Sequence, residues 1–261
     1  MRKMLFTILL LSLFGLLAAQ TLLLEDNFTG TVGTLLTANG WSAHNGSGST
    51  PMSIASPGLT YAGYPSSGIG NATSASVNGE DVNKPFTSVS SGSVYYSFLI
   101  NTGITTTTVG YSAHFMQNST TFHGRFWLKS VGTEVSFGLS KTTAAATWDP
   151  TNYAKDTTHL IVLKYTFNTG STNDDAVYMF VNPTLGGEEP TPTVSITTDT
   201  ALDATSISMI GLRQWNTATL ARFDGIRVGT SWADIAGSAA PSPTITVSPS
   251  SLSGFTYVFG A

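Results

Sequence analysis

The chain has 261 residues, of which only 10% are charged, and its formal net charge is −4. It contains no cysteine, which excludes disulfide bonds, thiolate metal sites, a cysteine nucleophile and lipoprotein acylation. The sequence shows no basic stripe and no basic amphipathic segment, which argues against nucleic acid and against anionic membrane surfaces as partners.

The first twenty residues have the order of a secretory signal peptide. Arg2 and Lys3 precede an apolar run from Met4 to Leu17, and the small residues Ala18 and Ala19 follow it. The run is shorter than the ~20 residues that span a bilayer, and no basic stop-transfer segment comes after it. We therefore predict cleavage near residue 20, export to the cell surface or medium, and no membrane insertion afterwards.

Short runs of β-branched and aromatic residues, separated by glycine, asparagine, serine and proline, recur along the rest of the chain. This pattern predicts strands. No helical segment of about 10–15 residues alternates with them, which argues against a parallel α/β sheet. The predicted strands span residues 22–28, 59–61, 72–77, 82–86, 93–101, 111–116, 124–129, 134–139, 159–167, 176–181, 194–197, 206–213 and 221–228.

Several of these strands are apolar on both sides, such as 160–163 and 177–181. Such strands are typical of the centre of a curved sheet with loops folded across its concave face. A hairpin turn is predicted at 131–133, because Gly132 can adopt the positive φ that such turns need. We expect a single helical turn at 233–236 and an all-β fold, an antiparallel β-sandwich of the jelly-roll kind.

The predicted domain spans residues 21–236. Pro241 and Pro243 indicate a linker over 237–243, because each proline removes a backbone donor and favours extended structure. Residues 244–261 are too few to bury a core of their own. We interpret them as the start of a further β module, with a disordered tail as the alternative.

Two segments resemble a known family. They are Leu24–Phe28, followed by Gly33–Leu36 and Gly40-Trp41, and the later stretch Phe223–Asp234. Together they resemble the laminin-G-like, concanavalin A-like jelly rolls of large secreted bacterial proteins. The segment 245–252 is similar to the opening of immunoglobulin-like repeats.

The resemblance implies that the first and last strands are neighbours in one sheet, which would place Phe28 and Ile226 in one core. It also implies a secreted or cell-surface setting. It implies no activity, because this architecture serves lectins, glycan-cleaving enzymes and structural spacers alike.

Glycan hydrolysis needs two carboxylates at a fixed separation. The spacing Glu-x-Asp-x-x-Glu on one strand is absent, and the pairs 25–26, 80–81 and 188–189 are adjacent in the chain, so we interpret them as solvated charges. His114 and His123 could hold a metal across neighbouring strands, or be hydrogen-bonded residues of the sandwich. The sequence predicts that the chain is not an enzyme. A glycan-active hydrolase with an unrecognised carboxylate pair remains an alternative, as does a purely structural domain.

One loop predicts a metal site. Asn173, Asp174 and Asp175 offer hard oxygen ligands beside the flexible Gly170, which suits calcium, and the resemblance also allows calcium. The same residue types are ordinary turn formers, and no EF-hand spacing is present.

Aromatic residues at strand ends or in loops predict the ligand site, because sugars bind by stacking on such rings. We select Tyr61, Tyr64, Trp148 and Trp215, and assign Trp41, Trp127 and Trp232 to packing. We therefore expect a non-catalytic binding or spacer module of a larger exported bacterial protein, with a polysaccharide or cell-surface glycan as its partner.

Overall fold

The computed structural model describes residues 22–237. The predicted signal peptide and the segment 244–261 lie outside this range, as does the predicted linker beyond Gly237. Among the described residues, no helix is long and apolar enough to cross a membrane.

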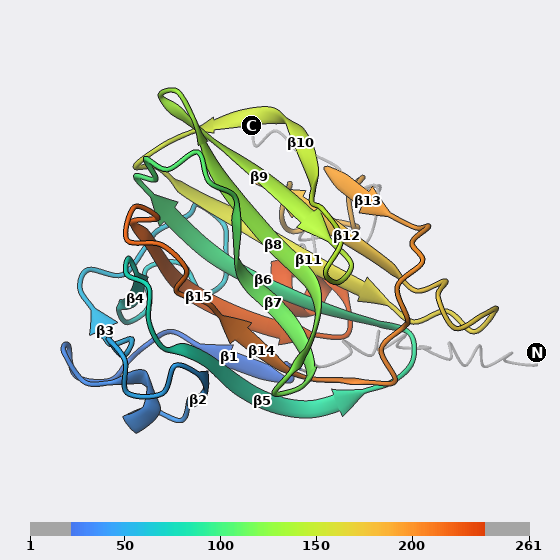
Figure 1. The fold of residues 1–261 in the computed structure, drawn as a ribbon, viewed down its shortest axis with the longest axis horizontal. Helices are drawn as coiled ribbons and strands as arrows, with labels where there is room; N and C mark the ends of the chain where they lie inside the picture. Colours follow the sequence, from blue (N-terminus) through green and yellow to red (C-terminus); the bar gives the residue numbers. More distant parts are fainter. Residues whose placement is uncertain (1–21, 238–261) are drawn as a thin grey trace, which may run out of the picture.

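Two antiparallel sheets pack face to face, so the predicted all-β sandwich is confirmed (Figure 1). The eight-stranded sheet has the order β13-β12-β11-β6-β15-β4-β3, with β1 also paired to β15. Its strands are β1 (Leu24–Asp26), β3 (Ile54–Ala55), β4 (Ala72–Ala75), β6 (Ser93–Thr102), β11 (Thr158–Thr166), β12 (Ala176–Val181), β13 (Val194–Ile196) and β15 (Ala221–Gly229).

The seven-stranded sheet has the order β10-β9-β8-β7-β14-β5-β2 and lies toward the viewer in Figure 1. Its strands are β2 (Ser42–Asn45), β5 (Asp81–Val89), β7 (Gly110–Asn118), β8 (Thr121–Val131), β9 (Glu134–Ser140), β10 (Thr147–Ala154) and β14 (Ile207–Leu212). A short 3-10 helix, η1 (Leu36–Ala38), precedes β2.

The long apolar strands and the edge strand β13 follow the sequence prediction, whereas the edge strands β2, β3 and β10 do not. The strand predicted at 59–61 is wrong, because Leu59 and Tyr61 belong to a loop. β2, β3 and β10 were not predicted. β10 contains Asp149-Pro150 and has an irregular register there, which an edge strand tolerates because one of its sides needs no ladder hydrogen bonds.

The main core fills the space between the sheets. The implied neighbourhood of the first and last strands is confirmed, because β1 pairs with β15 in the register Asp26 to Ile226. Phe28 and Ile226 accordingly lie in this one core. Its fully buried large side chains include Tyr96, Tyr165, Phe98, Phe115, Phe126, Phe137 and Phe223.

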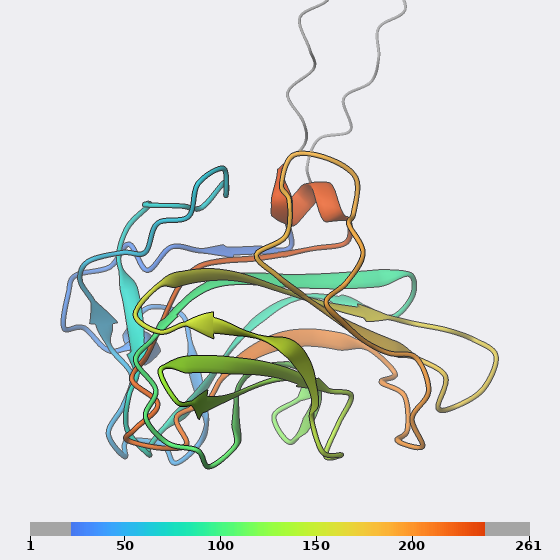
Figure 2. The same cartoon turned by 90° about the horizontal axis from the view of Figure 1, so that it is seen from above.

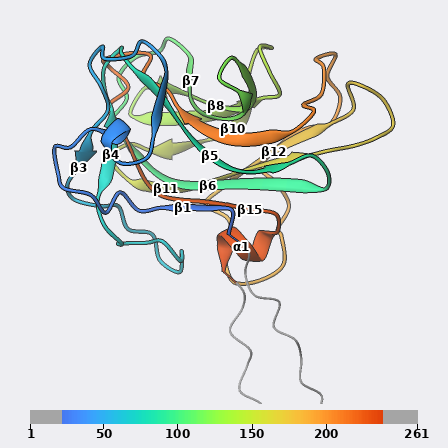
Figure 3. The ribbon, with the colours of Figure 1, turned by 90° about the horizontal axis from the view of Figure 1, so that it is seen from below.

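A second core covers the outer face of the eight-stranded sheet. There α1 (Trp232–Ala236) and loops pack Trp232, Ile235 and Leu59 on strand residues such as Leu99 and Val162. Figures 2 and 3 show α1 on this side of the sandwich. The predicted helical turn is thus confirmed, and the apolar strands are covered on both sides as predicted. The covering loops lie opposite the concave face, however, and not across it as the sequence predicted.

Within residues 22–237, no helix packs on the outer face of the seven-stranded sheet (Figure 2). This face is strongly curved: His44 on β2 and Phe122 on β8 stand four places apart in the strand order, yet their ring centroids are 5.4 Å apart. Across a flat sheet the same strands would be ~19 Å apart. The curvature makes this face concave and gathers its side chains.

Candidate functional site

Three aromatic rings form one row across the concave face. Strand register places Tyr111 beside Trp127, Trp127 beside Gly138, and Gly138 beside Trp148. All three rings are partly exposed. The row crosses four strands, from β7 to β10, a span of ~14 Å. We call Tyr111, Trp127 and Trp148 the aromatic row.

Local backbone features create the row. The neighbours of Trp127, Phe126 and Leu128, point into the main core, so the indole of Trp127 faces outward. A register shift in β7 between Tyr111 and Ala113 turns the Tyr111 ring to the same side. Gly138 leaves room for the Trp148 indole, because a Cβ atom there would lie 2.9 Å from Cε3 of Trp148.

Three cations contact the row. The guanidinium carbons of Arg125 and Arg213 lie 4.6 and 4.3 Å from the centroid of the Tyr111 ring, and they come from β8 and from the end of β14, on either side of β7. Lys129 Nζ lies 4.0 Å from the ring centroid of Trp148. Such contacts hold the cations in place while leaving their charge available. We call the aromatic row together with Arg125, Lys129 and Arg213 the cationic–aromatic face.

Neutral histidines fill the bottom of the concavity. His44 and His114 have ring centroids 5.8 Å apart, and Gly211 makes room for the His114 ring. Burial lowers the pKa of His44 to about 4. Burial, helped by His44, Arg125 and Arg213, holds the pKa of His114 well below its usual value. Both rings are therefore neutral at pH 7 and add no charge to the site.

Asp81 forms an ion pair with Arg213 of the cationic–aromatic face. Its Oδ2 lies 3.7 Å from Nε of Arg213, and its Oδ1 accepts a hydrogen bond from the Gln214 backbone N–H. Burial raises the pKa of Asp81, while the Asn45 amide, the Gln214 N–H and Arg213 act against that rise. Asp81 therefore offsets Arg213 in part, and it does not reach Arg125 as an ion-pair partner.

A cavity of about 560 Å³ adjoins Arg125 and Phe122 at the end of the face. Its wall carries the hydroxyl groups of several threonines and the amide of Gln117. The volume is within the ~300–1,000 Å³ range of small-molecule sites. The cavity is lined by Gln117, Thr120, Thr121, Phe122, His123, Arg125, Thr142, Thr143, Ala201, Leu202, Asp203 and Thr205.

The four aromatic residues predicted from sequence do not form one site. Tyr64 is buried in the second core, and its hydroxyl donates to the Gly225 carbonyl and contacts Ser97 Oγ. Tyr61 packs against the same core. Both therefore lie on the far side of the sandwich from Trp148. The stacking role assigned to Tyr64 is wrong, because its ring is 4% exposed.

Trp148 and Trp215 both belong to the side of the seven-stranded sheet. Trp148 is part of the aromatic row. The Trp215 indole packs on Gly110 and against the main core, and its Nε1 donates to Ser112 Oγ at 2.8 Å. Trp41 and Trp232 are buried, as predicted, whereas Trp127 is only partly buried and packs against the Tyr111 ring on the outer face of the sheet.

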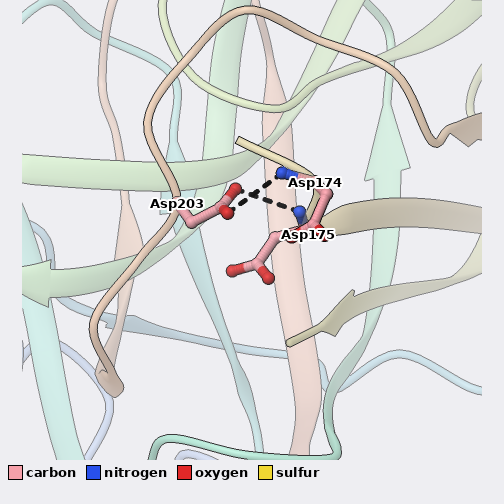
Figure 4. Close-up of side chains that lie close together, drawn as sticks. All are labelled: Asp174, Asp175 and Asp203. Atoms are coloured by element: carbon pink, nitrogen blue, oxygen red, sulfur yellow. Dashed lines mark hydrogen bonds between the residues drawn. The ribbon is translucent and has the colours of Figure 1, made fainter. Parts of the chain in front are cut away.

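The structure groups the residues of the predicted calcium loop differently, with Asp203 in place of Asn173. Asp174 and Asp175 cluster with Asp203, with one carboxylate oxygen of each within 4.8 Å of the others (Figure 4). Asp203 also accepts hydrogen bonds from the backbone N–H groups of Asp174 and Asp175. Asn173 uses its side-chain oxygen to accept from Ser171 instead. Calcium at this loop stays a prediction, with Asp203 as a ligand that the sequence did not indicate.

Lys141 already supplies a positive charge to this cluster. Its side chain is fully buried, and its Nζ lies 2.6 Å from Asp203 Oδ1 and 3.3 Å from the Asn173 carbonyl oxygen. Asp175 is engaged elsewhere, because it accepts from the Tyr165 hydroxyl and from the Asn168 N–H. A calcium ion here would have to compete with this ammonium group.

The interpretation of the acidic pairs as solvated charges is wrong for the pair 80–81 and for Asp26. Glu80 and Asp81 are 2% and 4% exposed, and Glu80 accepts a hydrogen bond from the Gly48 N–H. Asp26 pairs with Lys84 and also accepts from the Trp41 indole. These carboxylates hold strands and loops together.

The two proposals for His114 and His123 are also wrong. His114 lies on the concave face, whereas His123 contacts Tyr165 in the main core. They therefore point to opposite sides of the sheet and cannot share a metal. Neither ring has a hydrogen-bond partner among the described residues.

Four residues of the cationic–aromatic face were not predicted from the sequence: Tyr111, Arg125, Lys129 and Arg213. One signal was available: residues 125–129 alternate, with Arg125, Trp127 and Lys129 on one side of the strand and two apolar residues on the other. The position of Tyr111 depends on a register shift that no local pattern reveals.

No family model matches the sequence, and no curated protein matches it. Solved structures do resemble it at low identity. The globular domain of T. cruzi calreticulin is 12% identical with a TM-score of 0.47, covering 81% of this chain and 88% of that chain.

Two polysaccharide lyases are also similar. Alginate lyase Aly36B, bound to an alginate trisaccharide, is 12% identical with a TM-score of 0.49, covering 81% of this chain and 99% of that one. The endo-beta-1,4-glucuronan lyase from the fungus Trichoderma reesei is 10% identical with a TM-score of 0.47, covering 84% and 100%. The expectation that the chain is not an enzyme is contradicted by this comparison, because enzymes are among the similar structures. The likeness assigns no activity to this chain.

Proposed function

We propose that the chain is an exported domain that binds a polysaccharide on the concave face of its seven-stranded sheet. The observation that carries the proposal is the aromatic row, with Trp148 and Trp127 on either side of Gly138. Sugars present apolar C–H groups on one side of the ring and hydroxyls at its edge, so they bind where aromatic rings stand beside polar groups.

The surroundings of the row support this proposal. Ser140 Oγ accepts from the Trp127 indole at 2.8 Å, which fixes the orientation of that ring. The row is longer than one sugar ring, so it suits a polymer better than a monosaccharide. The signal-peptide pattern of residues 1–20 supports export, and polymers outside the cell would then be the accessible ligands.

Polysaccharide binding is a step common to lectins and to enzymes that cleave glycans. The test is therefore designed to report both binding and cleavage. Secreted full-length protein is titrated with a panel of neutral and acidic polysaccharides by isothermal titration calorimetry. The size distribution of each polymer is measured before and after incubation.

Trp148→Ala is the test variant. Loss of a stacking ring is expected to weaken binding by roughly 5–150-fold, which corresponds to about 1–3 kcal/mol. The matched control is Tyr178→Ala, which removes a half-buried ring from β12 in the other sheet. Equal affinity of Trp148→Ala and the parent protein, or no binding to any polymer, would contradict the proposal.

A further inference from the structure

The cationic–aromatic face concentrates positive charge on an acidic protein. The whole chain has 11 lysines and arginines against 15 acidic residues. Three of these cations, Arg125, Lys129 and Arg213, nevertheless contact the aromatic row. Scarce charge gathered at one place indicates a ligand of opposite charge more strongly than a uniformly basic surface would.

Most of this charge is not neutralised within the protein. None of the ion pairs among residues 22–237 includes Arg125 or Lys129. Nε of Arg125 is buried and has no hydrogen-bond partner in the described part of the chain, which leaves a donor unsatisfied. Arg213 has Asp81 at 3.7 Å, longer than a hydrogen bond.

Arg125 and Arg213 also repel each other. Both guanidinium groups lie within 4.6 Å of the centre of one ring, that of Tyr111. Burial lowers the pKa of Arg125, with Tyr111 raising it and Arg213 lowering it further. Arginine stays charged in proteins, so the repulsion between the two guanidinium groups destabilises the protein when no ligand is bound. An anion that contacts both groups would remove that cost.

We propose that this face binds an acidic polysaccharide, with a sugar carboxylate or sulfate held by Arg125 and Arg213 beside Tyr111. The inference rests on the proposed function and names the ligand class for the same site. Planar guanidinium groups bind carboxylate and sulfate-like oxygens through paired hydrogen bonds, and stacking on Tyr111 already orders them.

The cavity next to Arg125 extends the same site. A sugar unit whose acidic group meets Arg125 can place its neighbour against the threonine hydroxyls and Gln117 of the cavity wall. On the other side, Trp127 is two residues along β8 from Arg125. The acidic group thus lies between a polar cavity and the aromatic row, and the polymer runs along both.

The experiment compares matched polymers on the secreted full-length protein. Polygalacturonate offers carboxylates, the same polymer with its carboxyls reduced is the neutral control, and dextran sulfate against dextran offers sulfates. Affinity is measured by calorimetry at low and high sodium chloride. We expect at least one acidic polymer to bind more tightly than its neutral partner, and this binding to weaken at high salt.

Arg125→Gln is expected to weaken binding of the acidic polymer by roughly tenfold or more. Lys164→Gln, which removes one positive charge from β11 in the other sheet, is the control for net charge and should bind as the parent does. Arg125→Lys keeps the positive charge but lacks the paired donors, so its affinity for the acidic polymer should lie between those of Arg125→Gln and the parent. Circular dichroism and thermal melting confirm that each variant is folded.

The outcomes separate the two proposals. Neutral polymers bound as well as acidic ones, or an unchanged affinity in Arg125→Gln, would overturn the inference and leave polysaccharide binding in place. Failure of every polymer to bind would overturn both. The polymer that binds identifies the anionic group as carboxylate or sulfate.

Discussion

Gly138 lies beside Trp148 in the pairing of β9 with β10, and a Cβ atom at Gly138 would lie 2.9 Å from Cε3 of the indole. The ring therefore rests on bare backbone. An added methyl group would displace the ring from the sheet rather than distort β9, because Gly138 is not in the left-handed region. Gly138→Ala tests the aromatic row without removing any aromatic side chain.

We expect Gly138→Ala to reduce polysaccharide affinity and to leave the free energy of unfolding nearly unchanged. Titration calorimetry and urea unfolding measure the two quantities on the same preparation. Gly187→Ala is the matched control, because a Cβ atom there meets no atom within 4 Å. Affinity equal to that of the parent would show that the position of Trp148 is irrelevant to binding.

Tyr64→Phe is expected to lower the stability of the domain and to leave its polysaccharide affinity unchanged. The change removes the hydroxyl that bonds Ser97 Oγ and the Gly225 carbonyl, and it leaves both groups buried without that partner. The free energy of unfolding should fall by about 1–3 kcal/mol, while polysaccharide affinity stays unchanged. A loss of affinity without a loss of stability would restore Tyr64 as a binding residue.

The stability of the domain should increase as the pH rises from about 4 to about 6.5. Burial lowers the pKa of His44 and of His123 to about 4 and that of His114 well below its usual value, so the unfolded chain binds these protons more readily. Stability is thus lost as the pH falls through this window. Asp224 acts in the reverse direction, because burial raises its pKa to about 7.

Asp81, whose pKa burial also raises, acts in the same direction as Asp224. Three histidines outweigh these two aspartates, so the net effect is loss of stability in acid. Urea unfolding at pH 5 and pH 7 measures the difference. His123→Phe removes one buried imidazole and should reduce the difference in unfolding free energy between the two pH values. A domain equally stable at both pH values, or a variant with the same pH dependence as the parent, would contradict this assignment.

Lys141→Met tests the acidic cluster. Losing the buried ammonium leaves Asp203 beside Asp174 and Asp175 without their internal cation, and the free energy of unfolding should fall by up to about 3–5 kcal/mol. Millimolar calcium should then raise the melting temperature of the variant and have little effect on the parent.

Lys155→Met is the control for loss of a surface lysine, since Lys155 bonds Ser130 Oγ and a backbone carbonyl near the β8–β9 turn. A parent protein strongly stabilised by calcium would show that the ion displaces Lys141. Magnesium at the same concentration distinguishes binding at the cluster from a general effect of ionic strength.

Local patterns predicted the long strands well. The apolar run 176–181 matches β12, and Gly132 forms the expected turn between β8 and β9 with φ of 58°. β2 was missed because Ser42–Asn45 lacks β-branched or large apolar residues, and its pairing to β5 defines it as a strand.

The site was only partly predictable. Trp148 was identified because an aromatic residue near a turn signal is conspicuous in a sequence. The meeting of Arg125 with Arg213 was not, because 88 positions separate them and only the strand order β8-β7-β14 brings them to one ring. The exclusion of Tyr64 likewise required the second core, which local composition does not reveal.

The two ends of the described chain lie behind the proposed binding face. α1 and β1 both belong to the side of the eight-stranded sheet (Figures 2 and 3), so the described chain starts and ends there. The cationic–aromatic face lies on the opposite side, so a polymer longer than the domain can pass across it without meeting either end of the described chain.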